Sequence, residues 1–219
     1  APQSVCSDHF LDTLPLDGPV GYKLEAPPLH PILTAITLPD DGDAHARWMR
    51  DFRNLQVVIA LLRDGFHPGS PGGTVRLRGD GTPVLDYPLT PYLWDGVRRA
   101  FLTMAEVQFA AGATRVRPAH AAGSAFTTLA QAKAAIAGFD LRPLATRVVS
   151  AHVMGGAALG ADPRRAVIDV NGRHHHLANL YVVDGSLFPT SIGANPQLSI
   201  YAMSARLATA LAAEMRSRA

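Results

Sequence analysis

Glycine and proline recur along the whole chain and limit the length of the helices and strands that it can form. The 219 residues include 19 Gly and 17 Pro. Proline breaks a helix interior and glycine weakens one, so clusters of these residues mark turns and loops. A simple helical bundle is therefore disfavoured. The mixture of helical and strand patterns between the breaks predicts an α+β fold with hairpin sheet and helices segregated.

Composition narrows the class of protein further. Hydrophobic residues make up 47% of the chain and charged residues 17%, which is typical of a globular protein. The net charge is only +2 and the basic residues are scattered, so no nucleic-acid partner is expected. A single cysteine, Cys6, excludes an intrachain disulfide framework and a Cys-based zinc finger. No apolar run approaches the roughly 20 residues that cross a bilayer.

Local signals predict the elements of the first 150 residues. Asp43 can cap a helix that runs to about Asp64, with the apolar run Leu55–Leu62 buried in it. Gly79-Asp80-Gly81 predicts a hairpin between two short strands. The other expected elements are an extended segment Val20–Glu25, hairpin strands Thr74–Leu77 and Pro83–Tyr87, a Thr90-capped helix ending before Gly112, a strand Thr114–Arg117 and a helix Thr128–Ala137 closed by Gly138.

After Pro143 the sequence pattern changes to a loop-like, glycine-rich stretch, and we place an organisational boundary near residue 150. Asn171-Gly172 predicts a hairpin joining Ala166–Val170 to Arg173–His176. Leu180–Val183 is expected to form a short buried strand. A long amphipathic helix should run from Pro196 to about Met215, with one apolar face made of Ile200, Met203, Leu207 and Leu211.

Two patterns in this last part could carry chemistry. Asn195-Pro196 can be an ordinary helix start, or it can aim the positive end of the final helix at an anionic ligand. His152, next to the glycine pair Gly155-Gly156, can be a general base or simply a surface histidine.

Other chemistries lack their patterns. The run His174-His175-His176 alternates faces on a strand, and no carboxylate pattern accompanies it, so a solvated hairpin is favoured and no metal site is expected. The chain contains no Gly-x-Ser-x-Gly elbow, no Walker sequence and no Gly-x-Gly-x-x-Gly segment.

Residues 150–216 resemble the C-terminal signature of the glucose–methanol–choline (GMC) flavin oxidoreductases. Four blocks stand in the family's order: His152-x-Met-Gly-Gly, then Ala166-Val-Ile-Asp169, then Asn179-Leu-Tyr-Val-Val-Asp184-Gly-Ser-Leu-Phe-Pro189, then Gly193-x-Asn195-Pro196. The His-x-x-Gly-Gly and Asp-Gly-Ser forms are most similar to the branch of cholesterol oxidases and long-chain alcohol oxidases. Residues 20–118 resemble that branch's substrate-binding portion more loosely.

The resemblance implies a role for each matched residue. His152 matches the histidine that takes or orients the alcohol proton as hydride leaves for flavin N5, and Asn195 matches the partner that hydrogen-bonds the substrate oxygen. Asp184 and Gly185 match the segment along the ribityl–pyrophosphate part of FAD. Asn195, Pro196 and Gln197 match the turn against the flavin pyrimidine ring.

The resemblance also implies an organisation. Residues 1–150 would be the substrate-binding portion, and residues 151–219 the C-terminal GMC segment that completes an FAD-binding domain. Family members begin with a Rossmann segment that holds the adenine half of FAD, and this sequence has none. We therefore expect a missing N-terminal FAD-binding part or subunit as a partner, and little activity or FAD binding from this chain alone.

The resulting hypothesis is the C-terminal part of an FAD-dependent oxidoreductase acting on the CH-OH group of an apolar alcohol. The alternatives are a non-enzymatic lipid- or sterol-binding relic of the family, and a family member that uses flavin without net oxidation, such as a lyase. The bacterial cytoplasm is the expected location, with association at the membrane periphery left open.

Overall fold

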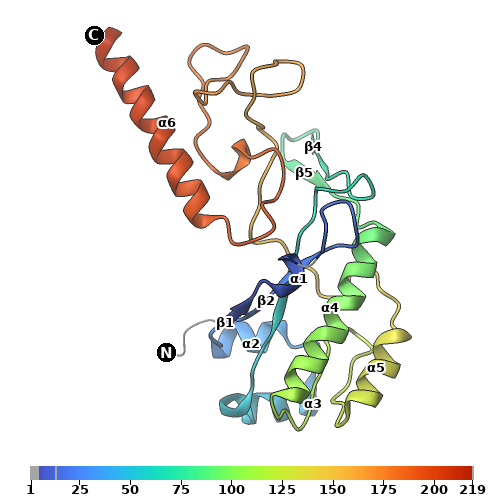
Figure 1. The fold of residues 1–219 in the computed structure, drawn as a ribbon. Helices are drawn as coiled ribbons and strands as arrows, with labels where there is room; N and C mark the ends of the chain where they lie inside the picture. Colours follow the sequence, from blue (N-terminus) through green and yellow to red (C-terminus); the bar gives the residue numbers. More distant parts are fainter. Residues whose placement is uncertain (1–4, 13, 219) are drawn as a thin grey trace. The chain divides into compact units, whose positions relative to one another are not determined.

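The structure, a computed structural model, describes residues 5–12 and 14–218 and divides into two compact units (Figure 1). The first unit contains the described residues of Ala1–Arg63 together with Leu89–Val149. The second contains Asp64–Pro88 and the described residues of Ser150–Ala219. The two units are defined by the contacts within each of them and not by function. The functional division into residues 1–150 and 151–219 therefore stays a prediction.

A three-stranded antiparallel sheet lies in the first unit, with β2 (Tyr22–Ala26) between β1 (Val5–Ser7) and β3 (Ile59–Leu62). Alternate side chains of β2 point to opposite faces. Tyr22 and Leu24 are buried, while Lys23 forms an ion pair with Glu25 at 3.1 Å. The extended segment expected at residues 20–25 is thus confirmed as a strand.

The long helix expected from Asp43 to about Asp64 is wrong. Helix α3 spans Gly42–Arg50, a 3-10 turn follows at Phe52–Asn54, and the apolar run then enters β3. An apolar run of this length fits a buried helix and a buried strand equally well. Pairing with β2, from Tyr22 opposite Leu62 to Glu25 opposite Ile59, decides for the strand.

Helices α4 (Pro91–Ala110) and α5 (Leu129–Ala137) begin and end where their sequence signals predict. The Thr90 hydroxyl accepts a hydrogen bond from the Leu93 amide at 3.4 Å, and the Thr128 hydroxyl accepts one from the Gln131 amide at 3.3 Å. These caps satisfy amide groups that have no partner within the helix.

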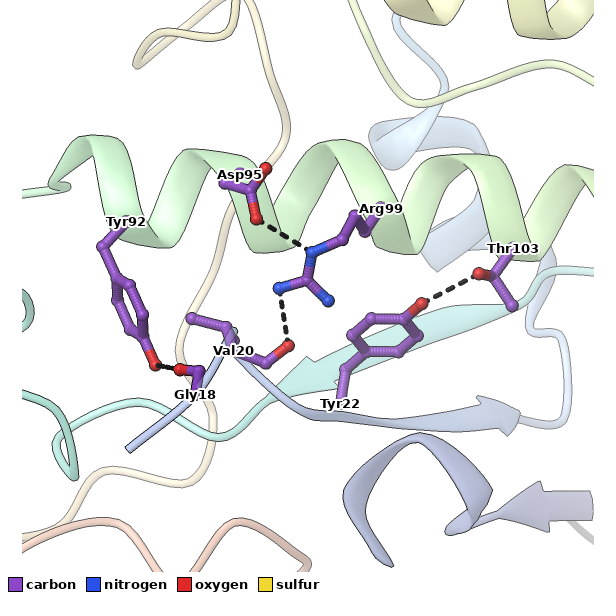
Figure 2. A network of polar contacts seen from close by, with 7 residues as sticks. All are labelled: Gly18, Val20, Tyr22, Tyr92, Asp95, Arg99 and Thr103. Carbon is purple, nitrogen blue, oxygen red and sulfur yellow. Dashed lines mark hydrogen bonds and ion pairs between the residues drawn. The ribbon is translucent and has the colours of Figure 1, made fainter. Parts of the chain in front are cut away.

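Polar contacts hold α4 against β2 and the segment that precedes it (Figure 2). The Tyr22 hydroxyl lies 2.8 Å from the Thr103 hydroxyl, and Arg99 donates to the Val20 carbonyl at 2.8 Å. Gly96 allows this close approach, because a Cβ there would lie 2.8 Å from Cβ of Val20. The absence of a side chain at Gly96 therefore sets how near the helix comes to the sheet.

The core of the first unit lies mainly between α4 and α5. Ile136 and Ala132 of α5 are fully buried, and they belong to one apolar cluster with Phe101 and Ala105 of α4. The remaining helices of this unit are short: α1 (His9–Asp12) and α2 (Pro31–Thr37). The strand expected at Thr114–Arg117 is reduced to a single bridge between Val116 and Phe126.

The second unit contains the predicted hairpin, which is confirmed. Strand β4 (Thr74–Leu77) pairs antiparallel with β5 (Pro83–Asp86), with Val75 opposite Leu85. Its long helix, α6, spans Gln197–Arg218, one residue later at its start than predicted. The predicted apolar face is confirmed by Leu207, which is buried with Ile168 and Leu187 in one cluster that Met203 packs against.

The three other strand segments expected in this unit are reduced to isolated bridges. Ala166–Val170 and Arg173–His176 share one bridge, between Ile168 and His174, in place of a continuous hairpin. Leu180–Val183 is not a buried strand, since Leu180 is 42% and Val183 37% exposed and Tyr181 alone bridges to Arg173. Coil segments pack on α6 here, so apolar residues find burial without a ladder.

None of the helices in the part of the chain that the structure describes is long and apolar enough to span a membrane.

Candidate functional site

Asp184 caps the 3-10 turn Gly185–Leu187 that follows it. Its carboxylate accepts hydrogen bonds from the Ser186 hydroxyl at 2.5 Å and from the Ser186 amide at 2.8 Å. These bonds stabilise the ionised form and hold the pKa of Asp184 below its usual 3.8. The carboxylate thus stays ionised at neutral pH, and its hydrogen bonds stabilise the 3-10 turn that follows it.

Asp184→Ala is expected to lower the free energy of unfolding by at most about 1 kcal/mol at neutral pH, the scale of a lost cap. Because the pKa is depressed in the folded state, this contribution is present above about pH 4 and is lost as the pH falls through the folded-state pKa. Urea unfolding of both proteins at neutral and at acidic pH measures it. A difference that stays constant down to acidic pH would contradict the assignment.

Gly185 lies where three segments of the second unit meet. A Cβ at this position would lie 3.0 Å from Cδ1 of Ile200 in α6 and 3.3 Å from the carbonyl oxygen of Val153. The Ala157 amide also donates to the Ser186 carbonyl at 3.0 Å, and the Leu159 amide to the Leu187 carbonyl at 2.9 Å. The loop that carries His152 therefore lies against the Asp184 turn and the first part of α6.

His152 itself is exposed, in a bend immediately before Val153. The glycines that follow it, Gly155 and Gly156, have φ values of 81° and 94°, a backbone conformation that side chains disfavour. A Cβ on Gly156 would meet nothing within 4 Å. The loop after His152 is thus shaped by backbone conformation and leaves space over Gly156.

The start of α6 presents exposed groups of the predicted site. Asn195 is exposed, Pro196 is buried, and the Pro196 carbonyl accepts from the Ile200 amide at 2.9 Å to open the helix. The first turn of α6, which lies wholly within the described residues, carries no acidic side chain. A helix start without acidic residues suits a negatively charged ligand, because its amide groups and dipole carry partial positive charge.

Two other predicted residues have hydrogen-bond partners within their own segments. The side-chain amide of Gln197 donates to the Tyr201 hydroxyl at 2.7 Å, one turn along α6. Asp184 is satisfied by Ser186 within its own turn. Gly185 lies close to the residue after His152 and to Ile200 of α6, so the backbone segments of these residues meet at Gly185.

The three consecutive histidines make separate contacts. His175 Nε2 lies 3.0 Å from the Gly160 carbonyl oxygen, and the ring centroids of His174 and His176 are 6.0 Å apart. With Asp169, Arg173 and Ala178 they line a polar pocket of about 340 Å³. Across residues 5–12 and 14–218, no group of three or more His, Cys, Asp or Glu side chains is arranged to hold a metal ion.

One polar cluster was missed by sequence reasoning. The Asp64 carboxylate accepts hydrogen bonds from the hydroxyls of Ser70 and Tyr87, and the neighbouring Gly65 carbonyl accepts from the Thr190 hydroxyl at 2.9 Å. Burial, and then the hydrogen bond to Asp64, raise the pKa of Tyr87. The hydrogen-bonded pairs of this cluster are 6, 23 and 125 positions apart in the sequence, so no single local pattern predicts the cluster.

The resulting arrangement combines an exposed histidine loop, a glycine junction and a helix start free of acidic groups. The sequence pattern of the GMC oxidoreductase family matches residues 68–204, which include all of these. Relatives include 6'''-hydroxyparomomycin C oxidase of Streptomyces lividus, 32% identical over 210 residues, which are 95% of this chain and 32% of that protein.

Two further relatives are named as oxidases of a long-chain alcohol and of cholesterol. The long-chain-alcohol oxidase of Arabidopsis thaliana is 25% identical over 81% of this chain and 24% of its own length. A cholesterol oxidase of Acinetobacter baumannii is 46% identical over 57 residues, which are 26% of this chain and 10% of that protein. The chain spans 37% of the length of a GMC-type oxidoreductase of Sinorhizobium fredii, so it matches a part of these relatives. The chain belongs to the GMC oxidoreductase family.

Proposed function

We propose that the chain is the catalytic-base and substrate-binding part of an FAD-dependent alcohol oxidoreductase. The observation that carries this proposal is the junction at Gly185, where the His152 loop, the Asp184 turn and the start of α6 meet in a member of the GMC family. Family members act as oxidoreductases on alcohols, and the segments that meet at this junction carry the residues that the family resemblance singles out. The complete activity would require the part of the longer relatives that this chain does not span.

The residues of the junction suit the cofactor. Asn195, Pro196 and Gln197 would hold the flavin ring at a helix start that lacks acidic groups, and Asp184 and Gly185 would lie along the ribityl–pyrophosphate part. FAD, when bound, supplies the acceptor for the hydride that leaves the alcohol carbon. Gly156 and Asn195 are both exposed, so a ligand can reach their segments from solvent.

His152 and Asn195 would act on the alcohol itself. A neutral imidazole accepts the hydroxyl proton while the carbon–hydrogen bond breaks, so that the alcohol loses one proton and one hydride and becomes a carbonyl compound. The Asn195 amide would donate a hydrogen bond to the same oxygen and hold it in place. The protein thus provides orientation and proton transfer.

An apolar alcohol is the favoured substrate class. Relatives named long-chain-alcohol oxidase and cholesterol oxidase support it. Half of the apolar run Leu55–Leu62 lies in strand β3, which pairs with β2, so this run gives the preference no support. A second candidate is a polyhydroxylated amine, since the relative named 6'''-hydroxyparomomycin C oxidase matches 95% of the chain. Competition among a fatty alcohol, a sterol and an aminoglycoside in steady-state assays decides between them.

Anaerobic mixing of the enzyme, expressed from its complete coding region, with these alcohols tests the reaction class. The protein should carry a flavin absorption band that bleaches on mixing, because hydride transfer leaves reduced flavin when oxygen is excluded. A lyase would consume its substrate with the band unchanged at the end. A colourless protein that gains no band from added FAD would favour the binding relic instead.

A further inference from the structure

The loop Asp64–Ser70 is fixed at its base by one carboxylate. Asp64 accepts hydrogen bonds from the Gly65 amide at 2.7 Å, from the Ser70 hydroxyl and from the Tyr87 hydroxyl. Ser70 is only 3% exposed, and the Ser70 amide donates to the His67 carbonyl at 2.8 Å. A carboxylate with three donors is a stable anchor, so the position of Gly65 is closely determined.

Gly65 connects the Asp64 anchor to a segment of the same unit that is distant in sequence. Its carbonyl accepts the hydrogen bond of the Thr190 hydroxyl at 2.9 Å. Gly65 has a φ of +87°, and a Cβ there would lie 2.2 Å from the Thr190 hydroxyl oxygen. The contact therefore depends on glycine at this position, and the loop and Thr190 fit each other closely.

Thr190 begins the short segment that ends in Asn195. Within it the Ser191 hydroxyl accepts from the Gly193 amide at 3.0 Å, and Gly193 has a φ of 75°. The far end is held by the first hydrogen bond of α6, from the Ile200 amide to the Pro196 carbonyl at 2.9 Å. The segment 190–195 is thus tied at both ends, by α6 after Asn195 and by the Gly65 contact at Thr190.

We propose that Thr190 is a positioning residue: its hydrogen bond to Gly65, on the Asp64 anchor, sets the place of Asn195 relative to the alcohol. The inference rests on the proposed function, because it assigns Asn195 a contact with substrate. Asp64 and Gly65 precede residue 68, where the family match begins, whereas Ser70, Tyr87 and Thr190 lie within the match. A small displacement of a substrate-orienting group slows the chemical step while leaving binding nearly intact.

The test compares Thr190→Val with Thr190→Ser in the complete flavin-containing enzyme, by anaerobic stopped-flow reduction of the flavin. Valine keeps the shape of threonine and removes the hydroxyl, so the limiting rate of reduction should fall by about 10-fold, with the apparent alcohol affinity changed little. Serine keeps the hydroxyl and should restore the rate to within about twofold of wild type. An unchanged rate in Thr190→Val would overturn the proposal.

A double-mutant cycle with Asn195→Ala shows whether Thr190 acts through Asn195. If it does, Thr190→Val should slow an Asn195→Ala enzyme by no more than about twofold, because the group that it positions is already absent. A full additional loss would overturn the positioning role. A wild-type flavin that the alcohols do not reduce, or an Asn195→Ala enzyme as fast as wild type, would instead defeat the proposed function.

Tyr87→Phe keeps the test informative if Thr190→Val does not accumulate. It removes one donor from Asp64 and leaves Thr190 in place, so a smaller loss of about threefold is expected, again without further effect in the Asn195→Ala background. Tyr181→Phe is the matched control, since the Tyr181 hydroxyl also meets a carboxylate of the second unit, that of Glu214 at 3.4 Å. Equal losses in the two phenylalanine variants would overturn the proposal.

Discussion

Replacing His152 with alanine is expected to slow turnover of the complete enzyme by about 10²-fold or more, the usual scale for loss of a general base. His152 is exposed in its bend, and the backbone of the next residue packs on Gly185. Removal of the imidazole should therefore leave the glycine junction in place and take away the proton acceptor. Steady-state rates with the best alcohol, together with the flavin spectrum, measure this loss at constant cofactor content.

His176→Ala is the matched control for this substitution. His176 is also an exposed histidine of the second unit, and it lies in the turn-rich segment beside His174. Its replacement should leave turnover unchanged. If His152→Ala were as active as His176→Ala, the proton-transfer role would fail and the lipid-binding relic would become the better interpretation.

Ile136→Ala is expected to lower the free energy of unfolding of the first unit by about 2–5 kcal/mol. The side chain is fully buried in the cluster between α4 and α5, so its removal takes apolar surface from the core and leaves a cavity. Urea denaturation followed by tryptophan fluorescence measures the change, since Trp94 packs against the same cluster.

Ile32→Ala provides the comparison, because Ile32 is 66% exposed in α2. Its free energy of unfolding should change by no more than about 0.5 kcal/mol. Similar losses in the two variants would mean that the cluster around Ile136 is not the core of the first unit.

Local sequence signals were sufficient to predict the elements whose ends they form, namely two capped helices and one hairpin. Thr90 and Thr128 each accept a hydrogen bond from the third residue after them, and Gly79-Asp80-Gly81 joins strands within a few residues of each other. Caps and tight turns are stabilised by contacts between residues close in sequence, so a short stretch of sequence is enough to predict them. The order of the four GMC blocks is likewise a property of the sequence, and it was sufficient to place the chain in its family.

The sequence predicted the residues of the candidate site, but it did not predict the contacts that hold their segments in place. The resemblance named His152, Asp184, Gly185 and Asn195, and the structure brings their backbone segments together at Gly185. Their catalytic and cofactor roles stay predictions. Thr190 and Asp64 could not be found in this way, since the hydrogen bond of Thr190 to Gly65 joins residues 125 positions apart.

The sequence by itself therefore determined the family, the caps of α4 and α5, the β4–β5 hairpin and the apolar face of α6, whereas α3 begins after Asp41 and not at the predicted Asp43 cap. The tertiary structure alone decided that Ile59–Leu62 is a strand, that Asp64–Pro88 belongs to the same compact unit as the described residues of Ser150–Ala219, and that Gly65 contacts Thr190. A short apolar run carries no period that separates helix from strand, so its partner in space makes the choice. A contact between distant segments likewise leaves no periodic trace in either one, and it exists only once the chain has folded.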